Sequence, residues 1–477
     1  MKTIIKYSLV SVLFLSLSCT KDIERFNDND KAPTSVPANA LFANATVELM
    51  DYLSSPNVNV NTFRLWSQHW TQTTYTDESN YQLTERNING EVFDRMYARV
   101  LRDVSESRAQ VNASTNSDDI KNTQLAVLDV IDVFAYSILV DIFNDVPYTE
   151  AIGGVENLTP AYDDAQTIYS DLASRLDAAI ATLGSSTADM GDFAGSDLIY
   201  AGSTSHWTML ANSLKLRMGM RMADVAGSGS QAMVEAAASG VFASNADHAY
   251  IMYQSSTPNT NPLWEDLVQS GRTDFVASNT LGDIMNSSND PRRAMYFRNL
   301  DSTGAIIGNP HGAGGAYPDH SQPGNMLEDP THPGVLLSYA EVCFHLADAA
   351  NRGWNVGGDA ATHYANGVSA SVLQWGGDQA AADAYLLESD VAWDASMANQ
   401  RIGTQKWIAM FDQGIEAWCT WKMYDHPTMN TAAAAGTTPP TRYNYSVDET
   451  QTNGPNVSEA NGGVADDVFN KVFWDVN

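Results

Sequence analysis

The fold is decided by residues 122–148, which read NTQLAVLDVIDVFAYSILVDIFNDVPY. Large apolar side chains recur there at steps of three and four residues, at Leu125, Leu128, Ile131, Phe134, Ile138 and Ile142. This spacing places them on one face of an α-helix. The run Asn144-Asp145-Val146-Pro147 then ends the pattern, because a proline cannot continue a helix. We therefore predict a long helix over 122–143 with a buried face.

The same pattern continues along the chain. A second stripe follows Pro160 and the capping pair Asp163-Asp164 and precedes Gly184, with apolar residues at Ile168, Leu172, Leu176, Ile180 and Leu183. Further helices are predicted at 205–224, 335–351, 360–375 and 402–421. Helices of this length in pairs are typical of helical-repeat scaffolds, although the strict signature of tetratricopeptide (TPR) repeats is absent. The fold class is mostly α, with TPR-like helix pairs forming a scaffold.

Two long segments interrupt the helices. Residues 251–334 and 425–470 are rich in Asn, Gly, Pro, Thr and Ser, with scattered aromatic side chains. Loops of this length in a compact body are usually functional. Strand signals are few and short. Because neither segment reads as a linker, we expect residues 37–477 to form a single domain with a loop-rich binding face.

The N-terminus predicts the compartment. Lys2 and Lys6 precede a short apolar run, Tyr7–Leu17, which is too short for a stable membrane span and is typical of a signal peptide. The run ends at Ser18-Cys19, so we predict a lipoprotein signal over 1–18, acylation of Cys19 and a polar tether over 19–36. Ser16 makes the cleavage motif looser than usual, and an ordinary signal peptide with an incidental cysteine is the alternative.

Composition excludes several classes of protein. The chain has 477 residues, 44% of them hydrophobic, and 26 Lys and Arg against 57 Asp and Glu give a net charge of −31. The apolar content excludes a disordered chain. The acidic balance opposes association with phosphate backbones, so nucleic acid is not expected as a partner.

Catalytic and metal-binding motifs are missing. The sequence has no nucleophile elbow, no HExxH, no P-loop and no dinucleotide-binding fingerprint. His311, His320 and His332, near Asp319 and Asp329, have no recurrent ligand spacing, and we expect them to be exposed loop histidines. Beyond Cys19, the two cysteines Cys343 and Cys419 are expected to be buried free thiols. No cofactor and no metal are predicted.

Aromatic side chains gather in a polar stretch. Residues 63–81 read FRLWSQHWTQTTYTDESNY and place Trp66, Trp70, Tyr75 and Tyr81 among amides, hydroxyls and acids. A flat ring receives the apolar C–H face of a sugar, and polar side chains bind the hydroxyl groups around it. Trp66 and Trp70 are four residues apart and would share one face of a helix, so both could be core residues instead. Tyr75 and Tyr81 lie among turn formers and are harder to bury.

A second ring and several polar neighbours complete the predicted ligand-binding set. Trp264 lies in the polar segment TNPLWEDL, near Arg272 and Asp274. Asp77, Asn80, Arg272 and Asp274 are predicted to bind hydroxyl groups, because they lie close to the aromatic residues in sequence. Trp354 follows Gly353 and is expected to pack against the scaffold rather than to face solvent.

The segments in their order resemble the SusD/RagB family of outer-membrane nutrient-binding lipoproteins, in its second, SusD-like branch. The resemblance rests on WSQHWTQTTYTDESNY at 66–81, VFAYSILVDIFNDVPYTEA at 133–151, PAYDDAQTIYSDLASRLDAAIATL at 160–183, HWTMLANSLKLRMGMRMADV at 206–225, NDPRRAMYF at 289–297, LLSYAEVCFHLADAANRGW at 336–354, HYANGVSASVLQWG at 363–376, TQKWIAMFDQGIEAWCTWKMYDHP at 404–427 and VFWDVN at 472–477. The run Lys21-Asp22 with Glu24 resembles the family's tag for export to the cell surface.

The resemblance implies a function without catalysis. It implies that the protein is anchored to the outer membrane and captures a poly- or oligosaccharide on loops away from the TPR-like surface. It also implies a partner, a SusC-like TonB-dependent transporter that receives the ligand, with helices 122–143 and 163–184 as scaffold or transporter-facing elements.

The ligand has to be predicted from the residues, because the family also includes peptide binders. The acidic, aromatic-rich chain favours a neutral glycan, and a β-glucan such as laminarin is the leading expectation. A local basic pocket around Arg272, Arg292 and Arg293 would weaken this expectation. The alternatives are a peptide-binding component of the same kind of importer and, from the many carboxylates, a glycoside hydrolase.

Overall fold

Helices dominate the structure, a computed structural model that describes residues 36–185, 187 and 189–476. The predicted signal peptide, the acylated Cys19 and nearly all of the tether lie outside the described residues. Residues from Ala38 onward form one unit. None of the described helices is both long and apolar enough to span a membrane.

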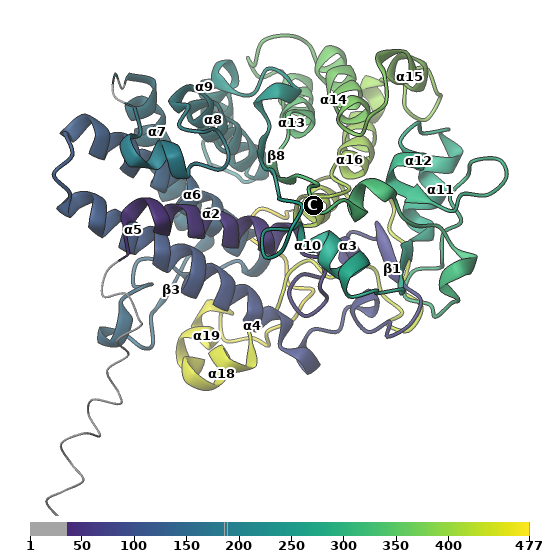
Figure 1. The fold of residues 1–477 in the computed structure, drawn as a ribbon. Coiled ribbons are helices and arrows are strands. Elements are labelled where there is room, and N and C mark those ends of the chain that lie inside the picture. Colours follow the sequence, from purple (N-terminus) through teal and green to yellow (C-terminus); the bar gives the residue numbers. More distant parts are fainter. Residues whose placement is uncertain (1–35, 186, 188, 477) are drawn as a thin grey trace, which may run out of the picture. The chain divides into compact units, whose positions relative to one another are not determined.

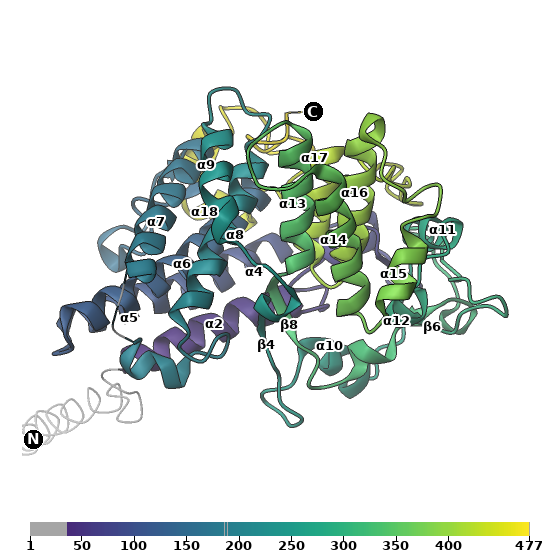
Figure 2. The ribbon, with the colours of Figure 1, turned by 90° about the horizontal axis from the view of Figure 1, so that it is seen from above.

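The helices fall into two groups, which Figures 1 and 2 show on opposite sides of this unit. The first group contains α2 (Ala38–Ser54), α4 (Ile88–Phe93), α5 (Arg102–Ala113), α6 (Asp118–Phe143), α7 (Ala165–Ser185), α8 (Thr204–Arg221) and α9 (Ser230–Ala237). The second group contains α13 (Tyr339–Asn351), α14 (Ala360–Gln374), α15 (Gln379–Tyr385), α16 (Ala398–Ala409) and α17 (Gly414–Tyr424). Helices adjacent in sequence pack against each other, as α6 does on α7 and α13 on α14. The prediction of a mostly α fold with TPR-like helix pairs is confirmed.

Helix α6 forms where the apolar pattern predicts it. Its first turn carries Asp118 and Asp119, which favour a helix N-terminus, and the hydroxyl of Ser117 accepts a hydrogen bond from the backbone N–H of Ile120. The helix ends at Phe143, because the next residue, Asn144, has a φ of 76° and leaves the helical region. Burial extends beyond the predicted face, because nearly every side chain from Ala126 to Phe143 is shielded from solvent. Helix α6 is therefore a central helix of the first group.

The prediction of one helix over 402–421 is wrong. Two helices, α16 and α17, are separated by a turn at residues 410–413. The apolar pattern continues through this turn, because Met410 and Phe411 are buried and the sequence gives no break signal apart from Gly414. A side chain at Gly414 would lie 2.8 Å from the backbone nitrogen of Arg64, so the second helix starts where the chain passes close to another segment.

The connecting segments of the chain, including the long ones at 251–334 and 425–470, contain short helices and strands. Their helices are α3 (Phe63–Trp66), α10 (Pro262–Trp264), α11 (Asn279–Ser287), α12 (Arg293–Tyr296), α18 (Val447–Thr452) and α19 (Gly454–Ala460). The strands form four antiparallel pairs, β1 (Trp70–Gln72) with β5 (Phe275–Ala277), β2 (Val146–Pro147) with β3 (Tyr162–Asp163), β4 (Ala249–Ile251) with β8 (Gly334–Leu337) and β6 (Phe297–Arg298) with β7 (Gln322–Pro323). The expectation of few, short strands is confirmed.

The interior contains two hydrophobic clusters. One lies mainly among the first group of helices, and the other joins β1 and β5 to the second group. Tyr339, Trp421 and Met423 pack against both clusters. Cys343 and Cys419 are buried free thiols, as predicted.

A buried network of charges connects the two groups of helices. Arg217 of α8 donates to both carboxylate oxygens of Glu341 on α13, at 2.6 and 2.8 Å. Arg221, one turn further along α8, donates to Glu416 of α17 at 2.5 Å. Lys406 of α16 donates to the same carboxylate and, at 2.9 Å, to the hydroxyl of Thr420. Four helices are thus joined by ion pairs that are buried away from water.

Burial by itself raises the pKa of Glu416, but the positive charges of Arg221, Lys406 and Arg217 outweigh it and hold this pKa well below its usual range. The carboxylate is therefore ionised in the folded protein. We expect Glu416→Gln to lower the free energy of unfolding by about 3–5 kcal/mol, because it leaves buried cations without a counter-charge. Urea denaturation measures this loss. The matched control is Glu459→Gln at an exposed position of α19, and an equally small effect of both variants would contradict the role of the network.

Candidate functional site

The aromatic segment predicted as a binding site forms a loop with a tightly bonded base. Residues 73–77, called the Tyr75 loop here, follow β1, which pairs with β5. Below the loop, the side-chain oxygen of Gln72 accepts hydrogen bonds from the N–H and the hydroxyl of Ser79, at 3.0 and 2.8 Å. The N–H of Thr73 donates to the carbonyl of Asp274 at 2.8 Å. These contacts fix where the loop leaves the body.

The tip of the loop presents an aromatic ring to solvent. The side chain of Tyr75 is 77% exposed, more than that of any other described tyrosine. Its backbone lies at φ 52°, a left-handed conformation that costs a non-glycine residue on the order of 1 kcal/mol. Strain of this kind persists only where the surroundings hold it, and it concentrates at functional sites. Tyr75 is therefore the strongest candidate for a ligand-stacking ring.

Asn80 holds three loops together beneath Tyr75. Its amide nitrogen donates to the carbonyls of Thr76 and Gly312, at 2.8 and 2.9 Å, and its oxygen accepts from the N–H groups of Ala434 and Ala435. Gly312 has φ 72°, and a side chain there would lie 2.6 Å from the Asn80 oxygen. Because Asn80 is buried and its amide is fully bonded, its role is to position these loops.

Tyr81 and Gln68 extend this support into the core. The side chain of Gln68 donates to the Tyr81 hydroxyl at 2.9 Å and to the carbonyl of Asn430 at 2.7 Å. The ring of Tyr81 stacks on the ring of His311, with centroids 5.9 Å apart. Burial lowers the pKa of His311 to about 3, so the imidazole is neutral near pH 7. Only 8% of Tyr81 is exposed, so it cannot offer a full ring face to water.

A groove of about 410 Å³ lies beside Asn80. It is lined by Asn80, Tyr81, Gln82, Leu83, Thr84, Ala435, Thr437, Pro440, Asn444, Asp466, Asp467, Val468 and Phe469. The ring of Phe469 is 46% exposed and lies among amide, hydroxyl and carboxylate groups. The groove therefore has the mixed apolar and polar lining that a sugar requires.

The charge of the groove is negative. Asp466 and Asp467 are among its lining residues, and no lysine or arginine is among the described residues that line it. Burial raises the pKa of Asp466, which accepts hydrogen bonds from Arg442 and from the N–H of Tyr445. Asp467 accepts from the N–H of Phe469 at 2.9 Å and is exposed. This lining opposes a polyanionic ligand.

Trp66 and Trp70 are core residues, the alternative that their four-residue spacing left open. Their side chains are 0% and 1% exposed. The ring of Trp66 lies 4.7 Å from that of Tyr443, and the ring of Trp70 lies 5.4 Å from that of Phe275. Neither ring has a face open to a ligand in this structure, because short helix α3 and strand β1 run through the interior.

The structure places the remaining predicted residues apart from the groove lining. Arg272 donates to both oxygens of Asp274, at 2.5 and 2.8 Å, and lies 4.1 Å from the centroid of the Phe275 ring. This pair braces β5 at the base of the Tyr75 loop. Trp264 is half-buried in α10, and Asp77 is exposed in the Tyr75 loop. Trp264 and Asp77 thus stay available for contact with a ligand.

The basic pocket that would have favoured an anionic ligand does not form around Arg292. Its guanidinium is buried and donates to Asp290, Ser371 and Gln405. Arg293 donates to the carbonyl of Asp290 at 3.1 Å, and Arg272 is paired with Asp274. Each cation is therefore committed to a neighbour within the fold.

The expectation of exposed loop histidines is wrong. His311 is buried and its ring stacks on that of Tyr81. His320 and His332 are half-buried, and His332 lies 3.2 Å from the carboxylate of Asp412.

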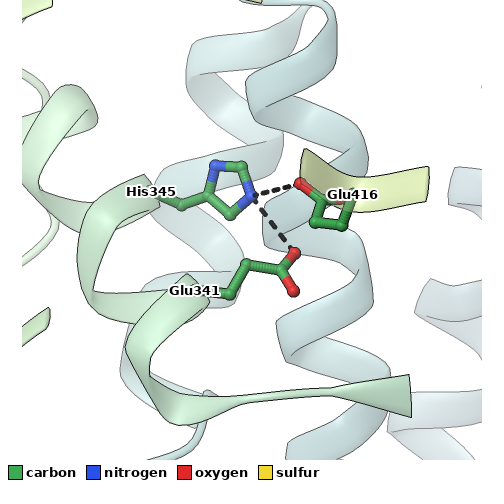
Figure 3. Close-up of side chains that lie close together, drawn as sticks. All are labelled: Glu341, His345 and Glu416. Atoms are coloured by element: carbon green, nitrogen blue, oxygen red, sulfur yellow. Dashed lines mark ion pairs between the residues drawn. The ribbon is translucent and has the colours of Figure 1, made fainter. Parts of the chain in front are cut away.

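Among the described residues, one group has atoms close enough for a metal ion, Glu341, His345 and Glu416 (Figure 3). Arg217, Arg221 and Lys406 already bind these carboxylates. A cation there would meet three buried positive charges, so the group fits the role of an ion-pair network and not that of a metal site.

Sequence reasoning missed the C-terminal wall of the groove. The segment DDVFN at 466–470 carries an aromatic residue among polar turn formers, the same signal that pointed to Tyr75. Applied to the loops after residue 425, that rule would have found Phe469 and its acidic neighbours. Their proximity to Asn80 follows only from the fold.

Comparisons with known proteins agree with this fold. A SusD-like family model described as "Starch-binding associating with outer membrane" matches residues 30–446. No curated protein matches the chain at a significant level.

Solved structures match almost the whole chain. A structure titled chitin-binding protein is 27% identical, with a TM-score of 0.80 over 92% of this chain and 100% of that one. A SusD homolog from Bacteroides uniformis is 25% identical, with a TM-score of 0.80 over 92% and 99% of the two chains. A chitin-binding SusD homolog from Flavobacterium johnsoniae is 24% identical, with a TM-score of 0.78 over 92% and 99%, and supports the fold alone.

We expect Asn80→Ala to lower the free energy of unfolding by about 2–3 kcal/mol, because it leaves buried backbone groups of three loops without partners. Limited proteolysis would also cut residues 431–437 faster. The control is Asn366→Ala on the exposed side of α14. Equal proteolysis of both variants would show that Asn80 does not hold the loops.

Proposed function

The chain belongs to the SusD-like family, and we propose that it captures a neutral, β-linked glycan at the cell surface without cutting it. The observation that carries the proposal is the exposed ring of Tyr75 on a strained loop, which is bonded through Thr76 to Asn80, a residue that lines a polar groove. A scaffold that maintains such strain keeps the ring in place before the ligand arrives. A preorganised ring loses little entropy on binding.

The ligand would contact the ring and the groove together. One sugar places its C–H face on Tyr75, and the exposed carboxylate of Asp77 accepts from its hydroxyl groups. The chain of sugars continues past Asn80 into the groove, where Phe469 offers a second ring and Asp467 and Asn444 offer polar groups. Trp264 is proposed as a further contact for longer chains.

Charge and similarity narrow the class of glycan. The acidic groove and the net charge of −31 disfavour alginate and sulfated polymers. A neutral β-glucan such as laminarin remains the leading candidate. A chitooligosaccharide is the second candidate, because the similar structure at 27% identity is a chitin-binding protein. Both ligands are neutral and β-linked.

We further propose that Cys19 anchors the protein to the outer membrane and that a SusC-like TonB-dependent transporter receives the glycan. Helix α6 is too deeply buried to contact a partner. Helix α7 and the loop before it are better placed, since Val155 and Leu158 are 87% and 76% exposed there. Exposed apolar side chains of this kind favour a protein contact.

We expect Tyr75→Ala to weaken binding of a laminari-oligosaccharide by roughly 1–3 kcal/mol while the melting temperature hardly changes, because the ring makes few contacts within the fold. Affinity electrophoresis across laminarin, soluble chitin oligomers, starch and alginate measures the loss. The matched control is Tyr250→Ala, at a solvent-facing position of β4.

The alternatives give different results. Retention by oligopeptides and by no glycan would replace the proposal with a peptide-binding component of an importer. Shortening of an oligosaccharide on incubation with the protein, seen by chromatography, would indicate a glycoside hydrolase. Equal binding by wild type and Tyr75→Ala would remove Tyr75 from the site.

A further inference from the structure

A tryptophan borders a second groove, far from Tyr75 (Figure 1). Trp354 follows α13, which ends at Asn351 and is followed by Gly353 with φ 80°. The N–H of Trp354 donates back to the carbonyl of Ala349 at 3.0 Å, closing the helix end. Part of the ring packs against the core, and the rest lines the groove. The helix end therefore fixes the backbone at Trp354, and the core restricts its ring on one side.

This second groove, called the Trp354 groove here, measures about 480 Å³. It is lined by Ala223, Val225, Gly227, Ser228, Gly229, Ser230, Gln231, Ala232, Glu235 and Trp354. Side chains added at Gly227 or Gly229 would meet nothing within 4 Å, so these glycines leave the groove open. Figure 1 shows α9, which supplies one wall, well away from β1.

Polar groups along this groove are held in place by hydrogen bonds, and some of their donors and acceptors have no partner among the described residues. Gln231 and the N–H of Asn355 both donate to the same oxygen of Glu235, at 2.9 Å each. The other carboxylate oxygen of Glu235 and the indole N–H of Trp354 bond to none of the described residues. One oxygen of Glu235 can therefore accept a hydrogen bond from a ligand, and the indole N–H of the partly exposed Trp354 can donate one.

The groove carries no free positive charge. No lysine or arginine is among its described lining residues. The nearby Arg352, whose guanidinium carbon lies 5.8 Å from the Trp354 ring, is held by both oxygens of Asp224 and by Asp348. The Trp354 groove thus repeats the composition of the first groove, an aromatic ring with acidic and amide groups.

We propose that the Trp354 groove is a second saccharide-binding site, which takes a sugar ring of the same neutral glycan. This inference rests on the proposed function. A sugar matches the groove because it needs one flat apolar surface and hydroxyl partners around it, whereas a lipid chain or an apolar peptide would need more apolar area. Two separated sites on one protein hold a polymer more firmly than either alone.

Affinity electrophoresis in gels containing laminarin, with a soluble chitin oligomer in parallel, tests the second site in the Tyr75→Ala background. The variants are Trp354→Ala and Ala232→Trp, the latter filling the groove from an exposed position of α9 without altering Trp354. We expect Tyr75→Ala to retain measurable retardation and either second change to reduce it about tenfold or abolish it. Matched controls are Trp393→Ala, at a half-buried tryptophan outside both grooves, and Ala380→Trp on exposed α15.

The outcomes separate the two claims. If Tyr75→Ala alone abolishes retardation, or if neither second change lowers what remains, the second site is overturned and the proposed function stands. If the unsubstituted protein is retarded by neither glycan, the proposed function fails and the second site fails with it.

Discussion

The scaffold depends on charges that are buried between helices. Arg217 and Arg221 of α8 meet Glu341 of α13 and Glu416 of α17, and Lys406 of α16 completes the network. Removing such groups from water costs several kcal/mol each, and only close, complete pairing offsets this cost. The network therefore tolerates one arrangement of the four helices. The segment that carries the Tyr75 loop packs on this frame, because α17 also contacts α3, which precedes β1.

A rigid frame makes it possible to hold a strained loop. Tyr75 has a left-handed backbone that an isolated loop would leave, and its ring gains almost nothing from packing. The compensation comes from side chains that bond to backbone groups below it, chiefly Gln72 and Asn80. These amides are buried and fully bonded, so they belong to the support of the site. The contact with a sugar is left to the exposed rings and carboxylates.

Local pattern was sufficient to predict the long helices, since α6 and α7 carry clear apolar stripes and end at Phe143 and Ser185, within one residue of the predicted ends. It was insufficient at 410–413, where buried Met410 and Phe411 continue the stripe through a turn. Local pattern also could not decide which rings face water. Tyr81 is buried because the ring of His311 stacks on it and because Gln68, which bonds to its hydroxyl, is itself held by the carbonyl of Asn430. His311 and Asn430 each lie more than 200 residues further along the sequence than the residue they contact. The buried ion pairs have the same origin, because they join residues from 217 to 416.

The central claim is that a ring held in water by a strained loop binds a carbohydrate beside an acidic groove. A crystal structure of the protein soaked with a laminari-oligosaccharide tests it most directly. The account predicts a sugar ring lying flat on Tyr75, with the next sugars following the groove toward Phe469. Ordered sugar at another place on the molecule, with the face of Tyr75 left bare, would contradict it.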